Sequence, residues 1–528
     1  MLSSGCATVQ PGGHRAPVHF PAVGINGDWL TVGGEKFLVV GVGYEYSSRP
    51  GQAPWKKKSE PDVMREDFRR IREAGFNTIR TWGPLSDEEL ELAAEYGLWV
   101  IQGLWIKTDA DFNDPDFRRA TYEFYEREVT RSAKHPNILF YLLLNEPHGG
   151  AVYRAGTEKM NEFFAEMVRV AKRCDPLRFF SYSNCISTDF MTPTMWDLTA
   201  QNVYPYSPAT IDRCLGYRSY LDWVKRTLAK DKPLIITEHG LSVSPNGDGR
   251  GYGGNTLSEQ RDGMIRMNED WLAAGASGGC AFMWTDGWWK TGNENQHNPG
   301  AESWYGLLEV DSSYLGQPRP VYFSLKEFNK AIRTKPRDGQ NVEDVFDVEV
   351  WSPGAARVQY RVDDRPWADI QRDGDWWWRG TASLVDAVDG GHYIWTRALD
   401  ADGRPQGEKP GIVRLSHLTE AGPDPCTVRF VDLPPQLSKD TAQRVVVEVL
   451  DMKGQPVGGV RVRIDRFLNT GWNEVGEDVE TDNQGRASAT FPALNELGIV
   501  SIAAGTVYEE GLLRTVIGDY RHVELVAE

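Results

Sequence analysis

The chain has 528 residues, with 58 Lys and Arg against 75 Asp and Glu, which gives a formal net charge of −17. This length corresponds to two to four domains at about 150 residues each. The acidic balance argues against a dominant surface for nucleic acid or anionic membranes, because the field of the whole protein repels phosphate. The 19 Trp, 20 Tyr and 20 Phe exclude disorder for most of the chain.

Residues 1–22 are rich in Gly and Pro and lack periodicity, so we expect a flexible tail or a signal remnant. The segment Leu2–Ala7 resembles the end of a bacterial lipoprotein signal peptide, although Leu2 lies four positions before Cys6 where the pattern has three. Two interpretations stay open. A truncated signal would place the protein outside the cytoplasm, in the periplasm or at the cell surface, with a lipid anchor at Cys6. The other interpretation is an incidental Cys in a disordered tail.

Short apolar runs alternate with amphipathic segments between residues 37 and 332, which is typical of βα units. Helix start signals separate several of the runs, namely Asp114 as an N-cap and the capping boxes Ser86/Glu89 and Thr256/Glu259. The eight predicted strands are 37–43, 77–82, 98–105, 138–144, 179–183, 199–204, 234–237 and 279–284.

Eight such units predict a (β/α)8 TIM barrel, which we place at residues 23–336. A doubly wound sheet is the alternative. It usually carries a Gly-rich turn after the first strand, whereas Gly43 here leads into Tyr44, Glu45 and Tyr46. No run of about 18 apolar residues is present, so no transmembrane helix is predicted.

After residue 336 the helical periodicity gives way to short alternating strands with Asp-Gly turn signals. A break near 421–425 divides this part into residues 337–422 and 423–528. The first part looks like an immunoglobulin- or fibronectin-like sandwich, and the second resembles bacterial immunoglobulin-like modules. The run Trp376–Trp378 could form a glycan-binding face, but strand alternation predicts that at least one of these rings is buried.

Two carboxylates follow strands of the predicted barrel on the side where TIM-barrel active sites lie. Asn145, Glu146 and Pro147 follow the fourth strand, and Glu238 ends the seventh. Glycoside hydrolysis requires such a pair, in which one carboxylic acid protonates the leaving oxygen while the other attacks the anomeric carbon or activates water. Their environments must set different protonation states.

With these residues in place, residues 24–332 resemble clan A of the glycoside hydrolases, the group that contains families 2 and 5. The resemblance implies that Glu146 is the acid/base and Glu238 the nucleophile. It also implies retention of anomeric configuration through a covalent intermediate, with carboxyl groups about 5–5.5 Å apart. Asn145 would hydrogen-bond the sugar 2-hydroxyl.

Three further residues match the family at strand ends. The resemblance implies that Arg80 holds the nucleophile ionised, that Tyr204 hydrogen-bonds the nucleophile, and that Trp284 forms the floor of the subsite for the sugar being cleaved. Each also has a structural alternative, such as an ion pair for Arg80 and a core-capping role for Tyr204.

Other candidates rest on their position alone. Glu45 follows strand one, and His148 and His239 flank the two Glu residues, where they could bind sugar or tune a pKa. Indole faces stack on pyranose rings, so we expect a ring of Trp side chains around the two Glu residues. The expected members are Trp82, Trp105, Trp284, Trp288 and Trp289.

The sequence therefore predicts a retaining β-glycosidase with an oligo- or polysaccharide substrate, β-glucan being favoured, and with no cofactor and no metal. A transglycosylase using the same site stays open, as does a non-catalytic glycan-binding or adhesion protein. A metal-dependent hydrolase is disfavoured, because the nine His residues provide no His-x-His pair on strand one.

Overall fold

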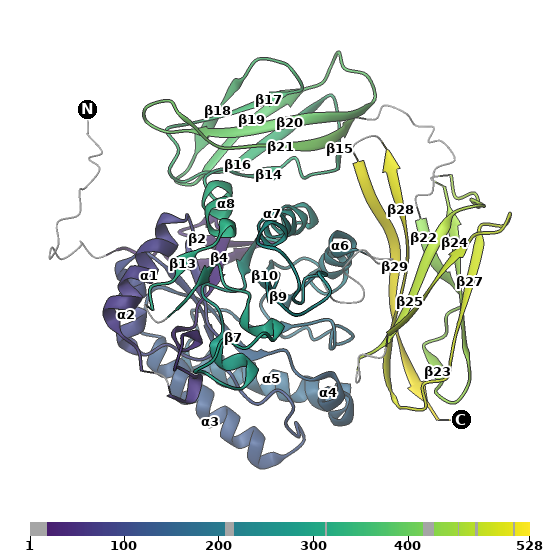
Figure 1. The fold of residues 1–528 in the computed structure, drawn as a ribbon, viewed down its shortest axis with the longest axis horizontal. Helices are drawn as coiled ribbons and strands as arrows, with labels where there is room; N and C mark the ends of the chain where they lie inside the picture. The colour runs from purple at the N-terminus through teal and green to yellow at the C-terminus, as the bar shows by residue number, and fades with distance from the viewer. Residues whose placement is uncertain are drawn as a thin grey trace.

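The computed structural model describes residues 18–527 except 57, 206–215, 312–313, 416–426, 452, 470–473 and 511–512. Cys6 and most of the predicted tail lie outside the described residues. A closed barrel of eight parallel strands is surrounded by helices, and the two β-sheet modules lie above it and beside it in the view of Figure 1. The strands, in barrel order, are β4 (Val39–Gly43), β5 (Thr78–Arg80), β6 (Trp99–Gly103), β7 (Ile138–Asn145), β8 (Phe180–Asn184), β9 (Thr199–Asn202), β10 (Leu234–His239) and β11 (Gly278–Ala281).

Three of the helices begin where the sequence predicts. Asp114 caps one helix, and both predicted capping boxes form. Gly75 and Gly97 follow two helix ends with positive φ, which a glycine adopts without steric cost. The helices are α1 (Pro61–Glu73), α2 (Asp87–Glu95), α3 (Pro115–Ser132), α4 (Gly149–Ala155), α5 (Thr157–Cys174), α6 (Tyr217–Thr227), α7 (Leu257–Ala274) and α8 (Pro320–Phe328).

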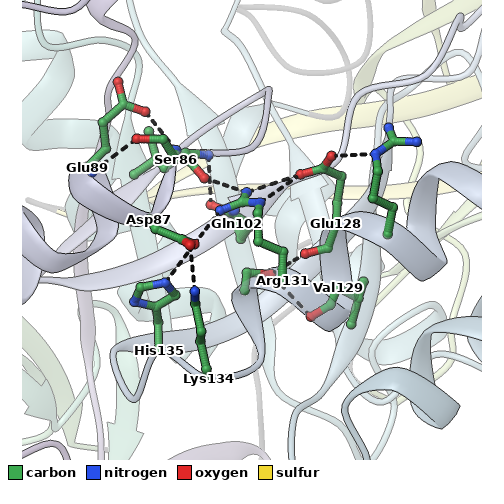
Figure 2. Close-up of polar contacts among 12 residues, drawn as sticks. Ser86, Asp87, Glu89, Gln102, Glu128, Val129, Arg131, Lys134 and His135 are labelled. Carbon is green, nitrogen blue, oxygen red and sulfur yellow. Dashed lines mark hydrogen bonds and ion pairs between the residues drawn. The ribbon is translucent and has the colours of Figure 1, made fainter.

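The start of α2 is tied to the end of α3 by a cluster of charged side chains (Figure 2). Asp87 accepts hydrogen bonds from Arg131 Nη1 at 2.8 Å and Lys134 Nζ at 2.5 Å, and His135 Nε2 lies 2.9 Å from Asp87 Oδ1. Bonds from Lys134 and His135 hold the pKa of Asp87 well below its usual range. Asp87 also lies in the first turn of α2, where a negative charge is favourable.

Four strands end earlier than predicted. β5 ends at Arg80 rather than at residue 82, β6 at Gly103 rather than at 105, β9 at Asn202 rather than at 204, and β11 at Ala281 rather than at 284. Beyond β11 the chain stays beside β10 and β4, because Phe282 N donates to His239 O at 2.9 Å and Trp284 N donates to Gly43 O at 2.8 Å.

All-β structure follows the barrel. One eight-stranded sheet has the order β14-β16-β19-β18-β17-β20-β21-β15. Its members are β14 (Ile332–Lys335), β15 (Gln340–Val342), β16 (Val345–Trp351), β17 (Arg357–Val362), β18 (Ala368–Asp373), β19 (Trp377–Ser383), β20 (Gly390–Leu399) and β21 (Pro405–Leu415). β14 precedes residue 336 but pairs with β16, so this sheet takes its first strand from the segment that we assigned to the barrel.

The last part of the chain forms two further sheets, one of three strands and one of five. The three-stranded sheet contains β22 (Thr427–Val431), β24 (Gln443–Leu450) and β27 (Arg486–Phe491). The five-stranded sheet contains β23 (Gln436–Ser438), β29 (Leu513–Val526), β28 (Gly498–Glu510), β25 (Arg461–Leu468) and β26 (Glu474–Glu480). The domain limits and the immunoglobulin-like character of both modules stay predictions. Of the helices in the described residues, none is both long and apolar enough to cross a membrane.

The tryptophan run of the first β-module packs against the barrel instead of forming an open face. Trp377 is buried and donates its indole N–H to Lys36 O at 2.8 Å. Lys36 lies in a small sheet that precedes the barrel, whose strands are β1 (Val23–Asn26), β2 (Trp29–Val32) and β3 (Glu35–Lys36). Trp378 is also buried, and Trp376 contacts Phe37 edge-on, with 5.6 Å between ring centroids. The run therefore joins two parts of the fold, and a glycan-binding face made of all three rings is wrong.

Candidate active site

A cavity of about 570 Å³ opens at the carboxyl ends of the barrel strands. Both predicted carboxylates, Glu146 and Glu238, line it. The other lining residues are Tyr44, Glu45, Tyr46, Ser47, Pro54, Trp55, Thr81, Trp82, Gly83, Pro84, Leu85, Trp105, Asn145, Tyr204, Phe282, Trp289, Lys290 and Glu302.

Glu238 is buried at the end of β10 and has three polar partners. Arg80 Nη1 forms an ion pair with Oε1 at 3.0 Å, and the indole N–H of Trp82 donates to the same oxygen at 2.8 Å. The Tyr204 hydroxyl donates to Oε2 at 2.6 Å. Hydrogen bonds to both oxygens fix the orientation of the carboxylate. The structure thus places Arg80 and Tyr204 where the resemblance implies, and adds Trp82 as a direct partner.

Glu146 directly follows β7 and has a different environment. Its Oε1 accepts one hydrogen bond, from Asn202 Nδ2 at 2.9 Å. Burial, followed by the charges of Glu238 and Glu302, raises the pKa of Glu146 to about 7. A carboxyl group with this pKa carries its proton near neutral pH, as a general acid must.

A network of amides and hydroxyls links the two carboxylates. Asn202 Nδ2 also lies 3.3 Å from Asn145 Oδ1, and Asn145 accepts a hydrogen bond from Arg80. On its other side, Asn202 Oδ1 accepts from Thr237 Oγ1 at 2.7 Å. Arg80, which pairs with Glu238, is thus connected through Asn145 to Asn202, which binds Glu146. The relative positions of the two carboxyl groups therefore depend on residues from four strands.

Four tryptophans line the cavity, but they are not all the expected ones. Trp82, Trp105 and Trp289 are confirmed as lining residues, and Trp289 Nε1 donates to Glu45 Oε2 at 3.3 Å. Trp55 was missed, because it belongs to a 3₁₀ turn between the first strand and its helix rather than to a strand end. Trp55 and Trp105 are 69% and 52% exposed, which leaves their faces available to a ligand at the rim.

Two of the expected tryptophans lie elsewhere. Trp284 is buried beneath the cavity, where its indole N–H donates to Asp67 Oδ1 at 2.9 Å, so its assignment as the subsite floor is wrong. The early end of β11 explains the difference, because it leaves Phe282 at the cavity instead. Trp288 stacks on His297 and donates to Val310 O at 3.1 Å, so it is not part of the lining either.

The two histidines do not line the cavity. His148 is exposed at the N-cap of α4. His239 is buried, and its Nε2 lies 2.7 Å from Asn268 Oδ1 on α7, because successive strand residues point to opposite faces and Glu238 points inward. Burial lowers the pKa of His239 to about 4. Neither residue binds substrate from these positions, which corrects the sequence-based assignment.

Three residues that the sequence did not single out belong to the site: Lys290 and Glu302 line the cavity, and Asn202 hydrogen-bonds Glu146. Asn202 ends β9 two residues before Tyr204, so the strand-end rule could have found it. Lys290 and Glu302 lie in 3₁₀ turns after β11, with Lys290 Nζ 4.0 Å from Glu302 Oε2. No strand pattern marks these turns. Among the described residues, no group of three or more His, Cys, Asp or Glu side chains could hold a metal ion.

Comparison with known proteins agrees with this geometry. Residues 23–253 match the family described as glycosyl hydrolases family 2, TIM barrel domain. A β-galactosidase of Enterobacter cloacae is 26% identical over 250 residues, covering 45% of this chain and 21% of that protein. A β-galactosidase of Yersinia pestis bv. Antiqua (strain Angola) is 25% identical over the same length. The chain thus spans about a fifth of the length of these curated relatives.

Solved structures with a similar arrangement include a β-glucuronidase of Parabacteroides merdae, with 15% identity, a TM-score of 0.47 and coverage of 94% of this chain and 64% of that one. A β-galacturonidase of Eisenbergiella tayi has 20% identity, a TM-score of 0.46 and coverage of 58% and 54%. Likenesses this distant carry no functional argument. The matched residues contain both Glu146 and Glu238, so the barrel of this chain is similar to the barrels of the clan A glycoside hydrolases.

Proposed function

We propose that the chain is a retaining β-glycoside hydrolase in which Glu238 is the nucleophile and Glu146 the acid/base. The observation that carries this proposal is the asymmetry of the two carboxylates. Glu238 accepts hydrogen bonds from Trp82 and Tyr204 and forms an ion pair with the Arg80 guanidinium, whereas burial and neighbouring carboxylates raise the pKa of Glu146 to about 7.

The proposed reaction has two steps. Glu238 attacks the anomeric carbon while Glu146 donates its proton to the leaving oxygen, which gives a glycosyl ester on Glu238 and the free alcohol. In the second step Glu146 removes a proton from water, which attacks the ester and restores both carboxyl groups. The sugar keeps its configuration because each step inverts it once. Tyr204 and Trp82 hold Glu238 in position for the attack.

For the substrate we propose a neutral β-hexoside. Four carboxylates line the cavity, namely those of Glu45, Glu146, Glu238 and Glu302, against one cation in the lining, Lys290, with Arg80 buried next to Glu238. Arg80 pairs with Glu238, and Lys290 lies 4.0 Å from Glu302. A carboxylate on the sugar would therefore enter a site without surplus positive charge.

The names of the curated relatives favour a β-galactoside. The tryptophan-lined opening fits a β-glucan, and we keep β-glucan, the substrate that the sequence favoured, as the more specific proposal. Transfer of the sugar to another sugar uses the same ester intermediate. It would appear as products longer than the substrate.

A substrate panel tests this proposal. Nitrophenyl β-galactoside, β-glucoside, β-mannoside and β-glucuronide, together with β-linked oligo- and polysaccharides, are incubated with the protein, and the products are analysed by chromatography. We expect turnover of neutral β-glycosides, loss of at least about a thousandfold in kcat for Glu238→Gln, and no preference for the glucuronide. No turnover of any β-glycoside, or full activity of Glu238→Gln, would contradict the proposed function. A preference for the glucuronide would contradict the proposed substrate class alone.

A further inference from the structure

The C-terminal β-structure reaches the barrel through a buried carboxylate near the active site. Asp189 lies in the loop after β8, and its side chain is fully buried. It accepts hydrogen bonds from the hydroxyls of Tyr220 on α6 at 2.8 Å and Tyr520 on β29 at 2.9 Å, and His522 Nε2 on β29 lies 2.7 Å from its other oxygen. We call these four residues the Asp189 cluster.

Apolar contacts accompany the cluster. The Tyr520 ring packs edge-on against Trp223 of α6, with 4.8 Å between centroids, and Tyr520 belongs to the same buried core as the barrel residues. Figure 1 shows β29 running beside α6, and the two elements are in contact. The C-terminal sheet is therefore packed against the barrel and is joined to it by more than the chain connection.

A second contact lies directly after the acid/base residue. Gly149 begins α4, three residues beyond Glu146. A Cβ atom at Gly149 would lie only 2.5 Å from the carbonyl oxygen of Asn469, which follows β25, and 2.7 Å from that of Ser187. The chain after Glu146 is thus enclosed between the C-terminal sheet on one side and the loop that carries Asp189 on the other.

The backbone at Glu146 depends on such support. Its φ is 44°, in the left-handed region that a residue with a long side chain rarely adopts and that is strained for it. The surrounding structure must hold this conformation. One restraint is the hydrogen bond from Glu146 N to Ser183 O at 2.8 Å, and Ser183 belongs to β8, the strand that leads into the Asp189 loop.

Hydrogen bonds within the loop after β8 stabilise its conformation. Thr188 Oγ1 donates to Asn184 Oδ1 at 2.6 Å, and Thr188 N donates to Cys185 O at 3.1 Å. A shift of Asp189 is therefore passed to the end of β8. Burial, followed by the charge of Glu146, raises the pKa of the Cys185 thiol, so Cys185 lies near Glu146.

We propose that Tyr520 and His522 are positioning residues for the acid/base Glu146, and that full catalytic activity therefore requires the C-terminal β-structure. Tyr520 and His522 hold Asp189 and thereby fix the loop after β8. Through Ser183 and Ser187, β8 and this loop fix the backbone at Glu146. This inference rests on the proposed function, because it assigns a role in the proton transfer of that reaction.

The leaving group provides a readout that a purely structural role would not change. A dinitrophenyl glycoside leaves without proton donation, whereas a methyl glycoside or an oligosaccharide needs the general acid. We compare kcat/KM for both kinds of substrate in the full chain, in Tyr520→Phe and in His522→Ala, and record the melting temperature of each. The matched control is Arg521→Ala, which lies between the two residues on β29 with its side chain 63% exposed.

We expect kcat/KM of Tyr520→Phe and His522→Ala to fall about tenfold for the poor leaving group and less than about twofold for the dinitrophenyl glycoside. Arg521→Ala should leave both values unchanged. Equal losses on both substrates, or no loss, would overturn the proposal. If His522→Ala fails to fold, Tyr520→Phe decides, since it removes one hydroxyl only.

The outcome is separable from that of the proposed function. Wild-type turnover, together with a loss of activity in Glu146→Gln that is confined to the poor leaving group, establishes the acid/base role first. If Glu146→Gln discriminates between the leaving groups while Tyr520→Phe does not, only the positioning role fails. If the wild type turns over neither substrate, the proposed function fails.

Discussion

The hydroxyl of Tyr204 donates to Glu238 at 2.6 Å, on the carboxylate oxygen that Arg80 and Trp82 do not contact. Tyr204 itself is buried against Phe282 and Tyr305, which fix its ring. The oxygen that it holds is therefore fixed independently of the other one. This relationship makes Tyr204 a sensitive point for testing the geometry of the nucleophile.

Replacement of Tyr204 by Phe removes that hydrogen bond and keeps the ring. We expect kcat to fall by roughly ten- to a hundredfold with KM changed less than about threefold, because one charge-assisted hydrogen bond is worth about 1.5–3 kcal/mol. Steady-state kinetics on the best aryl glycoside measure both constants. A rise in KM at constant kcat would mean that Tyr204 binds substrate and does not position Glu238.

The raised pKa of Glu146 predicts the alkaline limb of the pH profile. The acid must be protonated in the free enzyme, so kcat/KM for a substrate with a poor leaving group should fall as pH rises through about 7. With a dinitrophenyl glycoside, kcat/KM should decrease less over the same pH range. An equal decrease for the two substrates would mean that a group other than Glu146 causes it.

The same pKa has a consequence for stability. Glu146 has a pKa near 4.5 when exposed and about 7 in the fold, so between these values the folded state binds more protons than the unfolded state. Its contribution to stability therefore decreases as pH rises through this window. Glu146→Gln, which carries no charge, should melt at a higher temperature than the wild type at pH 8. The difference should shrink at pH 4. A destabilised variant at pH 8 would contradict the burial of this charge.

Trp105 tests the rim of the cavity. It is 52% exposed, and its replacement by Ala should leave folding intact. Loss of one stacking surface, worth about 1 kcal/mol, should raise KM for oligosaccharides roughly fivefold while leaving a small aryl glycoside nearly unaffected. Equal effects on both substrates would place Trp105 at the sugar being cleaved.

Trp284 provides the contrasting case. Because it is buried and bonded to Asp67, Trp284→Phe leaves a buried carboxylate with one donor fewer, at a cost of about 1–3 kcal/mol. Thermal unfolding should show a lower melting temperature, with KM unchanged. A rise in KM without a lower melting temperature would show that Trp284 binds substrate and would contradict its position in the structure.

The sequence predicts the barrel and both carboxylates because these depend on local patterns. Apolar runs define the strands, and polar residues at their carboxyl ends lie near the barrel opening, as Glu146 and Glu238 do. The same rule fails for Trp284, which follows β11 but is buried with its indole N–H on Asp67, while Phe282 lines the cavity. Which of these side chains faces the cavity depends on tertiary contacts.

Contributions from irregular segments and from distant parts of the chain were not predictable. Trp55 and Lys290 reach the cavity from 3₁₀ turns that carry no periodic pattern. The contacts of Asp189 with Tyr520 and His522 join residues more than 300 positions apart, and no local pattern encodes such pairs.

The central claim is that Glu238 forms a covalent bond to the sugar. The measurement is mass spectrometry of the protein after reaction with the dinitrophenyl glycoside of its best sugar, fluorinated at carbon 2 so that the ester forms faster than it is hydrolysed. The account predicts a mass increase of one fluorinated glycosyl residue, located on the peptide that contains Glu238 and absent from Glu238→Gln. Turnover of the parent glycoside with no adduct, or an adduct on another residue, would contradict it.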